Sequence, residues 1–404
     1  MYNIAFTALA AGYVPFSLVF LSVVILKTPR SFHKYVWMYA LTFGMLAYCF
    51  NPVYEIDLSR YFGQLDYCRT IPFSRALSWR DDGLIIKNLV FWLVSKTGDN
   101  HILPLLSVGI VYGVAGFVSV SALDERKSDL WKLLLFQVML LPMYNIVSNV
   151  RNVAAFSLLI WAAYRDLVNK KRDMLTLALY ILPCFIHMTG FVLVLFRISL
   201  VLLKKQPYIG LLLTLGIPSA SISLYENVGR PDLPGNIGKI ISRAIFKSYA
   251  STVNSSEYAV RTREGGYFNF SRLLMFVICG IVLYMILSQL RDAECRYREY
   301  KLFCGLLCAI TLIWVVLGTV KYWVFAFAVV VSCGPVLADF RRDRRIKKWM
   351  KQLFRLVIPL CMCIRVLLEL YYIRRRVDFI DLSVNVLTTS IYVVIGKMLL
   401  YFMV

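Results

Sequence analysis

An arginine and a histidine have the residue types and spacing best suited to chemistry in this sequence. Arg151 stands in "YNIVSNVRNVAAFSLLIWAAY", where amides and a serine give way to an apolar stretch. His187 stands further along, in "PCFIHMTGFVLVL". A guanidinium binds phosphate oxygens through paired hydrogen bonds, and a neutral imidazole takes up a proton near neutral pH. The two residues together indicate a site that binds an anion and moves a proton.

A helix that begins near Arg151 is expected to position both residues. Ser148 or Asn149 can cap this helix, and a helix N-terminus beside an arginine favours an anion. About 17 residues lead down to the basic turn "NKKRD" and about 13 lead back to His187, so each leg covers roughly 20 to 25 Å. We therefore expect Arg151 and His187 at the same outer depth. The plainer alternative is that Arg151 reaches lipid head groups and His187 hydrogen-bonds a carbonyl.

The composition is that of an integral membrane protein. The chain has 404 residues and is 59% hydrophobic, whereas an average soluble domain is about 45 to 50% apolar. The first apolar run has no basic residue ahead of it and indicates a retained helix rather than a signal peptide. We expect an all-α, polytopic fold, a single transmembrane domain over residues 1–404 with about 11 to 14 transmembrane helices. The expected spans lie near 4–26, 35–50, 102–122, 132–147, 151–168, 174–186, 188–203, 207–224, 272–290, 302–319, 322–338, 353–371 and 383–403.

The basic residues indicate topology rather than nucleic-acid binding. The formal net charge is +22, but the lysines and arginines lie mostly in short loops that alternate with the spans. The positive-inside rule makes these loops cytoplasmic and places the N-terminus outside. Arg374, Arg375 and Arg376 disagree, because they fall on the outer side. Residues 174–203 are divided into two short helices at "PCFIHMTG", which keeps Lys204 and Lys205 inside.

Two longer outer segments remain, residues 51–101 and 225–271. The first contains "GLIIKNLVFWLVSKTG", whose apolar face predicts an interfacial helix. It also contains "YEIDLSRYFGQLDYCR", which mixes acids, guanidinium groups and aromatics. A solvated loop and part of a functional site are both compatible with that mixture. The second segment is a large basic outer loop.

Neither the cysteines nor the carboxylates suggest a metal. The ten cysteines include no CxxC pair, and we interpret them as small hydrophobic residues. The outer side has no DxD-type motif and no carboxylate pair with spacing suited to a divalent cation. The sequence therefore predicts neither a metal nor another cofactor.

Three motifs resemble those of the EpsG-like branch of Wzy-type polysaccharide polymerases, over roughly residues 35–200. These are a D-x-x-x-Y element after the second span, an arginine followed by small residues at a helix start, and a histidine followed by a small residue at the next outer turn. The matching positions are Asp57, Tyr61, Arg151, Ala154, Ala155, His187, Thr189 and Gly190.

The resemblance implies a membrane glycosyltransferase in the bacterial inner membrane, with its active site facing the periplasm or cell exterior. Such a protein moves a growing glycan from polyprenyl diphosphate onto a hydroxyl of the next lipid-linked repeat unit. Its implied partners are the polyprenyl-diphosphate-linked oligosaccharide and membrane lipids, and a chain-length-regulating co-polymerase is a further candidate.

The implied chemistry assigns roles to individual residues. Arg151 would meet the departing diphosphate. His187 is the first candidate for the base that takes the acceptor proton, and Asp57 is the second. The reaction would need no metal. The other candidates are Arg60, Arg230, Arg243, Arg261 and Arg263 for the diphosphate and Tyr61, Asn149 and Asn152 for sugar.

Three other functions remain open. A glycan ligase has nearly the same chemical requirements. A sugar O-acyltransferase would also use histidine and arginine, but its acyl donor arrives from the cytoplasm. A transporter or flippase places charges near the midplane, often in repeated halves, and no repeat is evident here. Arg365 and Glu369, four residues apart in one span, form either a structural ion pair or part of a cavity.

Overall fold

The protein is helical, as its composition predicts. The computed structural model describes residues 12–52, 57–78, 84–123, 129–187, 189–217, 266–292, 294–316, 322–340, 346–373 and 378–403. Within these ranges the regular elements are all helices, and an isolated bridge joins Tyr13 to Ser390. Most of the basic outer segment lies outside the described residues, with Arg230, Arg243, Arg261 and Arg263, and so do Arg374, Arg375 and Arg376.

Several helices are suited to crossing a membrane. In the described part of the chain, three are long and apolar enough: α7 (Ile102–Ala122), the Phe270–Leu290 part of α18 (Gly266–Leu290), and α19 (Arg298–Val316). A fourth span would combine α20 (Tyr322–Ser332) and α21 (Gly334–Phe340), which are bent by 55° at their junction. All four coincide with predicted spans, and the polytopic all-α class is confirmed.

Other predicted spans correspond to shorter or more polar helices. The division at "PCFIHMTG" is confirmed by a short 3-10 helix, η4 (Leu182–Phe185), between two α-helices. The helices in this group are α2 (Val14–Lys27), α3 (Val36–Tyr48), α10 (Val150–Leu167), α11 (Met174–Ile181), α12 (Gly190–Lys205), α13 (Pro207–Leu211) with the π-helix η5 (Leu212–Gly216), and α22 (Lys348–Ile373).

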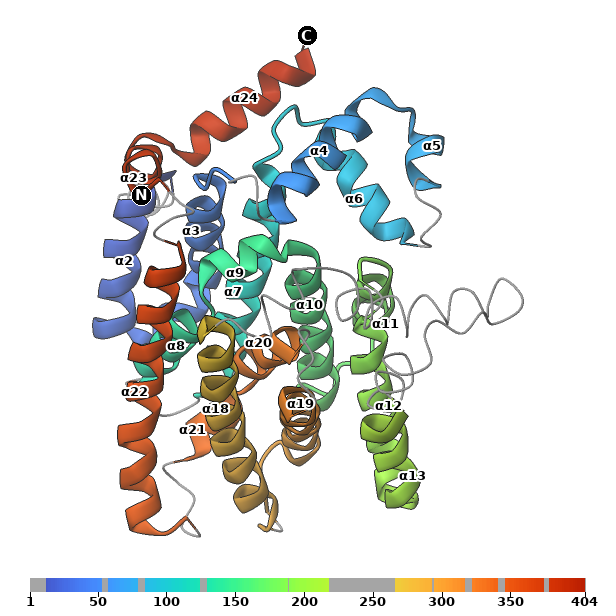
Figure 1. Cartoon of the computed structure of the whole chain (residues 1–404), viewed down its shortest axis with the longest axis vertical. Helices are drawn as coiled ribbons and strands as arrows, with labels where there is room; N and C mark the ends of the chain where they lie inside the picture. The colour runs from blue at the N-terminus through green and yellow to red at the C-terminus, as the bar shows by residue number, and fades with distance from the viewer. Residues whose placement is uncertain are drawn as a thin grey trace.

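Two predicted spans are not continuous helices. Residues 132–147 form α8 (Leu130–Leu140) and α9 (Met143–Ser148), because a residue before proline avoids helical backbone angles and Leu141 precedes Pro142. Residues 383–403 divide between α23 (Phe379–Thr388) and α24 (Ile391–Met403), where Thr389 has an extended backbone. Figure 1 shows α24 lying across one end of the helical bundle rather than within it.

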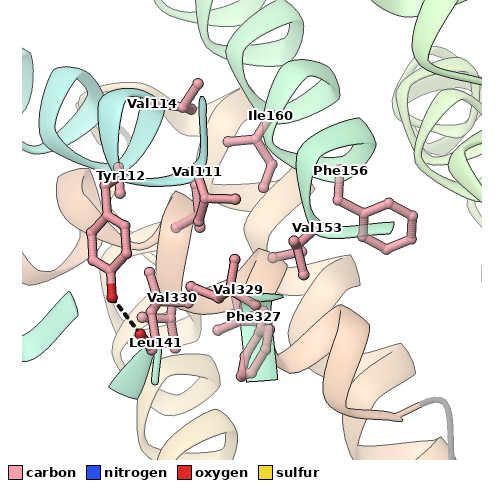
Figure 2. Packing of buried hydrophobic residues seen from close by; sticks show 14 of the residues in the cluster. Val111, Tyr112, Val114, Leu141, Val153, Phe156, Ile160, Phe327, Val329 and Val330 are labelled. Atoms are coloured by element: carbon pink, nitrogen blue, oxygen red, sulfur yellow. Dashed lines mark hydrogen bonds between the residues drawn. The ribbon is translucent and has the colours of Figure 1, made fainter. Parts of the chain in front are cut away.

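The core is built by α7, α10 and α20, whose buried apolar side chains meet in Figure 2. Close packing of α3 on α7 depends on glycine, because a Cβ at Gly44 would lie 2.7 Å from the Leu105 carbonyl oxygen. The Tyr112 hydroxyl donates to the Leu141 carbonyl at 2.5 Å, just past the end of α8 (Figure 2). This bond satisfies a backbone acceptor that the break before Pro142 leaves outside the helix.

The first outer segment forms a cap of three helices. These are α4 (Asp57–Thr70), α5 (Phe73–Leu77) and α6 (Ile85–Ser95), and α6 packs against the other two. Helix α6 lies within the predicted interfacial helix. Lys96 joins α6 to α4 by donating to the Arg69 carbonyl at 2.8 Å. In Figure 1 this cap lies at the same end of the molecule as α24 and the start of α10.

Candidate functional site

Arg151 lies at the start of α10 and stacks on a ring of the cap. Its Cζ is 4.8 Å from the ring centroid of Tyr61, which belongs to α4 and is only 2% exposed. A guanidinium over an aromatic face gains about 0.5 to 2 kcal/mol, depending on how dry the site is. The fold therefore brings together two candidate residues that are far apart in the sequence.

Arg151 has no carboxylate partner among the described residues. Its Nε also has no hydrogen-bond partner there, and the stacking on Tyr61 is its only side-chain interaction in that part of the chain. The side chain is half-buried. A guanidinium carries five N–H donors and no acceptor, so this cation retains its charge and its donors for a ligand.

The amides near Arg151 bond differently from the prediction. Asn149 occupies the N-cap position of α10, but its side chain does not cap that helix and instead donates to the Asn145 carbonyl at 3.3 Å. Ser148 likewise donates to the Tyr144 carbonyl at 2.9 Å. The expected cap is wrong because α9 ends immediately before α10, and these side chains reach back to carbonyls of α9. Asn152 is buried.

The loop before Arg151 is tied to a distant helix. Asn145 donates to Glu369 of α22 at 3.2 Å, and Glu369 lies 4.0 Å from Arg365. Arg365 in turn donates to Ser271 of α18 at 2.7 Å. Glu369 also lines a cavity of about 180 Å³ with Tyr144. Arg365 and Glu369 thus form an ion pair, and Glu369 is also part of a cavity wall. No sequence pattern predicts the hydrogen bond between Glu369 and Asn145.

Asp57, Arg60 and Tyr61 join Arg151 in one outer cluster. Arg60 and Asp57 form an exposed ion pair at 3.2 Å in the first turn of α4. The Cζ of Arg60 lies 5.5 Å from the Tyr61 ring centroid, so this ring contacts two guanidinium groups. The outer cluster, defined by these four residues, combines two cations, one carboxylate and one aromatic face.

His187 lies in the turn between η4 and α12. Its Nδ1 accepts a hydrogen bond from the Thr189 backbone N–H at 3.3 Å. In a neutral imidazole with Nδ1 accepting, the proton resides on Nε2, which is then a donor. A Cβ on Gly190 would lie 2.9 Å from Leu159 of α10, and Leu159 is about 12 Å below Arg151 along the helix. The turn that carries His187 therefore lies beside α10, and its depth relative to Arg151 stays a prediction.

Cysteines and acids form no metal-ligand cluster in the described part of the chain, where no group of three or more His, Cys, Asp or Glu is placed to hold an ion. Eight of the ten cysteines are buried. They pack as small hydrophobic residues, as the sequence indicates.

Comparison with known proteins identifies one family. The model of the EpsG family matches residues 87–374. The match includes Arg151, His187 and Glu369 and leaves out the cap helix α4. It therefore begins later and extends further than the resemblance expected over residues 35–200. Comparisons with curated proteins and with solved structures give no match.

Proposed function

Because the chain belongs to the EpsG family of polysaccharide-polymerase-like membrane proteins, we propose that it elongates a glycan on a lipid carrier. The glycan moves from polyprenyl diphosphate onto a hydroxyl of the next lipid-linked repeat unit. The observation that carries this proposal is the guanidinium of Arg151, which lies over the Tyr61 ring and has no acidic partner among the described residues. Such a transfer releases a diphosphate, and a fixed cation stabilises the charge that develops on it.

Arg151 binds the diphosphate of the donor in this proposal. A guanidinium matches two phosphate oxygens at once, and the start of α10 adds backbone N–H groups that no side-chain cap engages. Arg60 stands beside the same ring and gives a second cation. The further cations proposed for this role are Arg230, Arg243, Arg261 and Arg263 of the basic outer segment.

The remaining roles concern the acceptor. Its hydroxyl must lose a proton as it attacks the anomeric carbon. We assign His187 as the first candidate for the base that takes this proton, in a turn where the Thr189 backbone N–H lies 3.3 Å from its Nδ1. Asp57, a carboxylate of the outer cluster, is the second candidate. Tyr61, Asn149 and Asn152 remain the proposed sugar contacts.

The test is polymerisation by purified protein from lipid-linked repeat units in EDTA, analysed on a gel. We expect a ladder from the wild type, no ladder from Arg151→Ala, and a normal ladder from Arg291→Ala, which removes an exposed arginine at the end of α18. Transfer of glycan to a different lipid acceptor without a ladder would instead identify a ligase. An unchanged ladder from Arg151→Ala would contradict the assignment.

A further inference from the structure

An apolar groove of about 610 Å³ runs along α3, α7 and α10. It exists because α3 and α7 approach at glycines, where a Cβ on Gly113 would lie 3.0 Å from the Ala40 Cβ, so no side chain fills this flank. Leu106 is 45% exposed in its wall, so the groove opens sideways. Residues of its lining are Trp37, Leu106, Gly109, Gly113, Leu158 and Trp161.

The open face of α10 joins this groove to Arg151. From Asn152 to Leu167 the helix is buried except at Leu158, Trp161 and Arg165, which are half-buried, as is Arg151. Spacings of seven, three and four residues place these positions on one side of a helix. Leu158 and Trp161 line the groove, so Arg151 lies on the same side of the helix, two turns closer to its outer end.

The outer end of the groove is level with Arg151. The rings of Phe117 on α7 and Trp161 on α10 are 6.5 Å apart. About 11 residues before this contact, or roughly 16 Å along each helix, α7 reaches Leu106 and α10 reaches its first residues. Leu106 is in the groove wall. An apolar chain that leaves an anion held by Arg151 therefore enters the groove at its outer end.

We propose that this groove binds the polyprenyl chain of the lipid-linked substrate while Arg151 holds its diphosphate, an inference that rests on the proposed function. The arrangement of charge favours this occupant, because a cation without an acidic partner among the described residues stands at the outer end of a groove lined by apolar residues. The diphosphate between the polyprenyl chain and the sugar carries about two negative charges, whereas the phosphodiester of an ordinary phospholipid carries about one, so the diphosphate gains more from that cation. The sides of the groove then supply apolar contact for a single chain.

The test uses a sugar-free polyprenyl diphosphate with a photoreactive diazirine in its chain. Full-length protein in phosphatidylcholine nanodiscs is irradiated with this probe, and the labelled peptides are mapped. We expect labels on α7 and α10 of the wild type and at least tenfold less labelling in Leu106→Trp and Leu158→Trp, whose indoles fill the groove. Leu356→Trp is the matched control, because Leu356 is 70% exposed on α22, outside the groove.

Unchanged labelling in both groove variants would overturn the proposal, provided that gel filtration shows folded protein. Equal competition by phosphatidylglycerol would also overturn it, by revealing a site for ordinary lipid. Labelling needs no sugar, so a wild type that labels in the groove but makes no polymer contradicts the proposed function alone. Normal polymerisation by the filled-groove variants contradicts the groove alone.

Discussion

The arginines at the two ends of α10 have different partners. At the C-terminal end of α10, Asp166 accepts hydrogen bonds from Arg172 at 2.9 Å and from Arg197. Arg165 pairs with Asp173 at 2.6 Å. At the outer end, Arg151 has an aromatic ring but no acid among the described residues.

This difference separates charges that hold the fold from a charge that is available to a ligand. Asp166 is 4% exposed. One of its arginines attaches α12 to α10, and the other attaches the turn between α10 and α11 to α10. A buried carboxylate of this kind is stable only with its partners. Arg151 is held by stacking instead, and none of the described acids compensates its positive charge. The comparison predicts loss of activity from changes at the N-terminal end of α10 and loss of stability from changes near its C-terminal end.

The largest effect is expected from Arg151→Ala. Removing one group that stabilises transition-state charge lowers rates by about 10²- to 10³-fold, and the outer position of this side chain should leave the thermal unfolding temperature nearly unchanged. Initial rates of polymer formation and unfolding in detergent measure the two quantities. Arg151→Lys should recover part of the rate, because an ammonium keeps the charge but loses the bidentate geometry. If the variant has a lower unfolding temperature but a normal rate per folded molecule, Arg151 has a structural role like the arginines at the other end of α10.

Asp166→Ala is expected to have the next largest effect, on stability. It leaves the guanidinium groups of Arg172 and Arg197 without their carboxylate. Breaking a fully buried pair costs about 3 to 5 kcal/mol, and the cost here should be smaller because the Arg172 side chain is 67% exposed and that of Arg197 is 20% exposed. Thermal unfolding of purified protein measures the loss, and Asp166→Asn, which keeps the shape, should lose less. Polymer formed per folded molecule should stay at the wild-type level. If the Asp166→Ala protein unfolds at the wild-type temperature, the claim that this ion-pair cluster stabilises the fold is contradicted.

Tyr61→Leu tests whether the aromatic ring under Arg151 contributes to binding of the donor. It removes the ring over which Arg151 lies while keeping an apolar side chain. The loss of about 0.5 to 2 kcal/mol of cation–π attraction should raise the KM for the lipid-linked donor by roughly two- to thirtyfold. Tyr61→Phe is the matched control, because it retains the ring. If Phe and Leu raise KM equally, the hydroxyl rather than the aromatic face is the important group.

Asp173→Ala, in the turn that follows α10, should give the smallest effect. The Thr176 backbone amide and hydroxyl, together with Arg165, lower the pKa of the Asp173 carboxyl to about 2. A lowered pKa means that the contribution to stability is complete above the unfolded-state pKa and disappears as the pH falls toward 2. The unfolding temperatures of wild type and variant should therefore converge between about pH 5 and pH 2. A gap that is constant over this range would show that the charge of Asp173 is not its source.

The sequence predicts best where one local rule is sufficient. Long apolar stretches with few charged residues identify α7, α18 and α19, since about 20 apolar residues cross a bilayer. The breaks at Pro142 and Thr389 were missed because short apolar runs on both sides of a break resemble a single span. The D-x-x-x-Y and arginine motifs did identify residues that meet in the outer cluster.

Contacts between distant segments were beyond prediction. The hydrogen bond from Asn145 to Glu369 depends on how α22 packs beside α9. The packing of Gly190 against Leu159, which brings the His187 turn beside α10, also joins segments that no local pattern pairs. The stacking of Arg151 on Tyr61 likewise depends on the docking of the cap, which no local pattern encodes.

The most direct measurement of the central claim is the affinity for a sugar-free polyprenyl diphosphate. We would compare wild type, Arg151→Ala and Arg291→Ala in phosphatidylcholine nanodiscs. Hydrogen bonds to a charged group contribute about 1.5 to 3 kcal/mol, so Arg151→Ala should bind roughly 10- to 100-fold more weakly, and Arg291→Ala should bind as the wild type does. Equal affinity of wild type and Arg151→Ala would contradict the claim that the unpaired outer arginine binds the diphosphate.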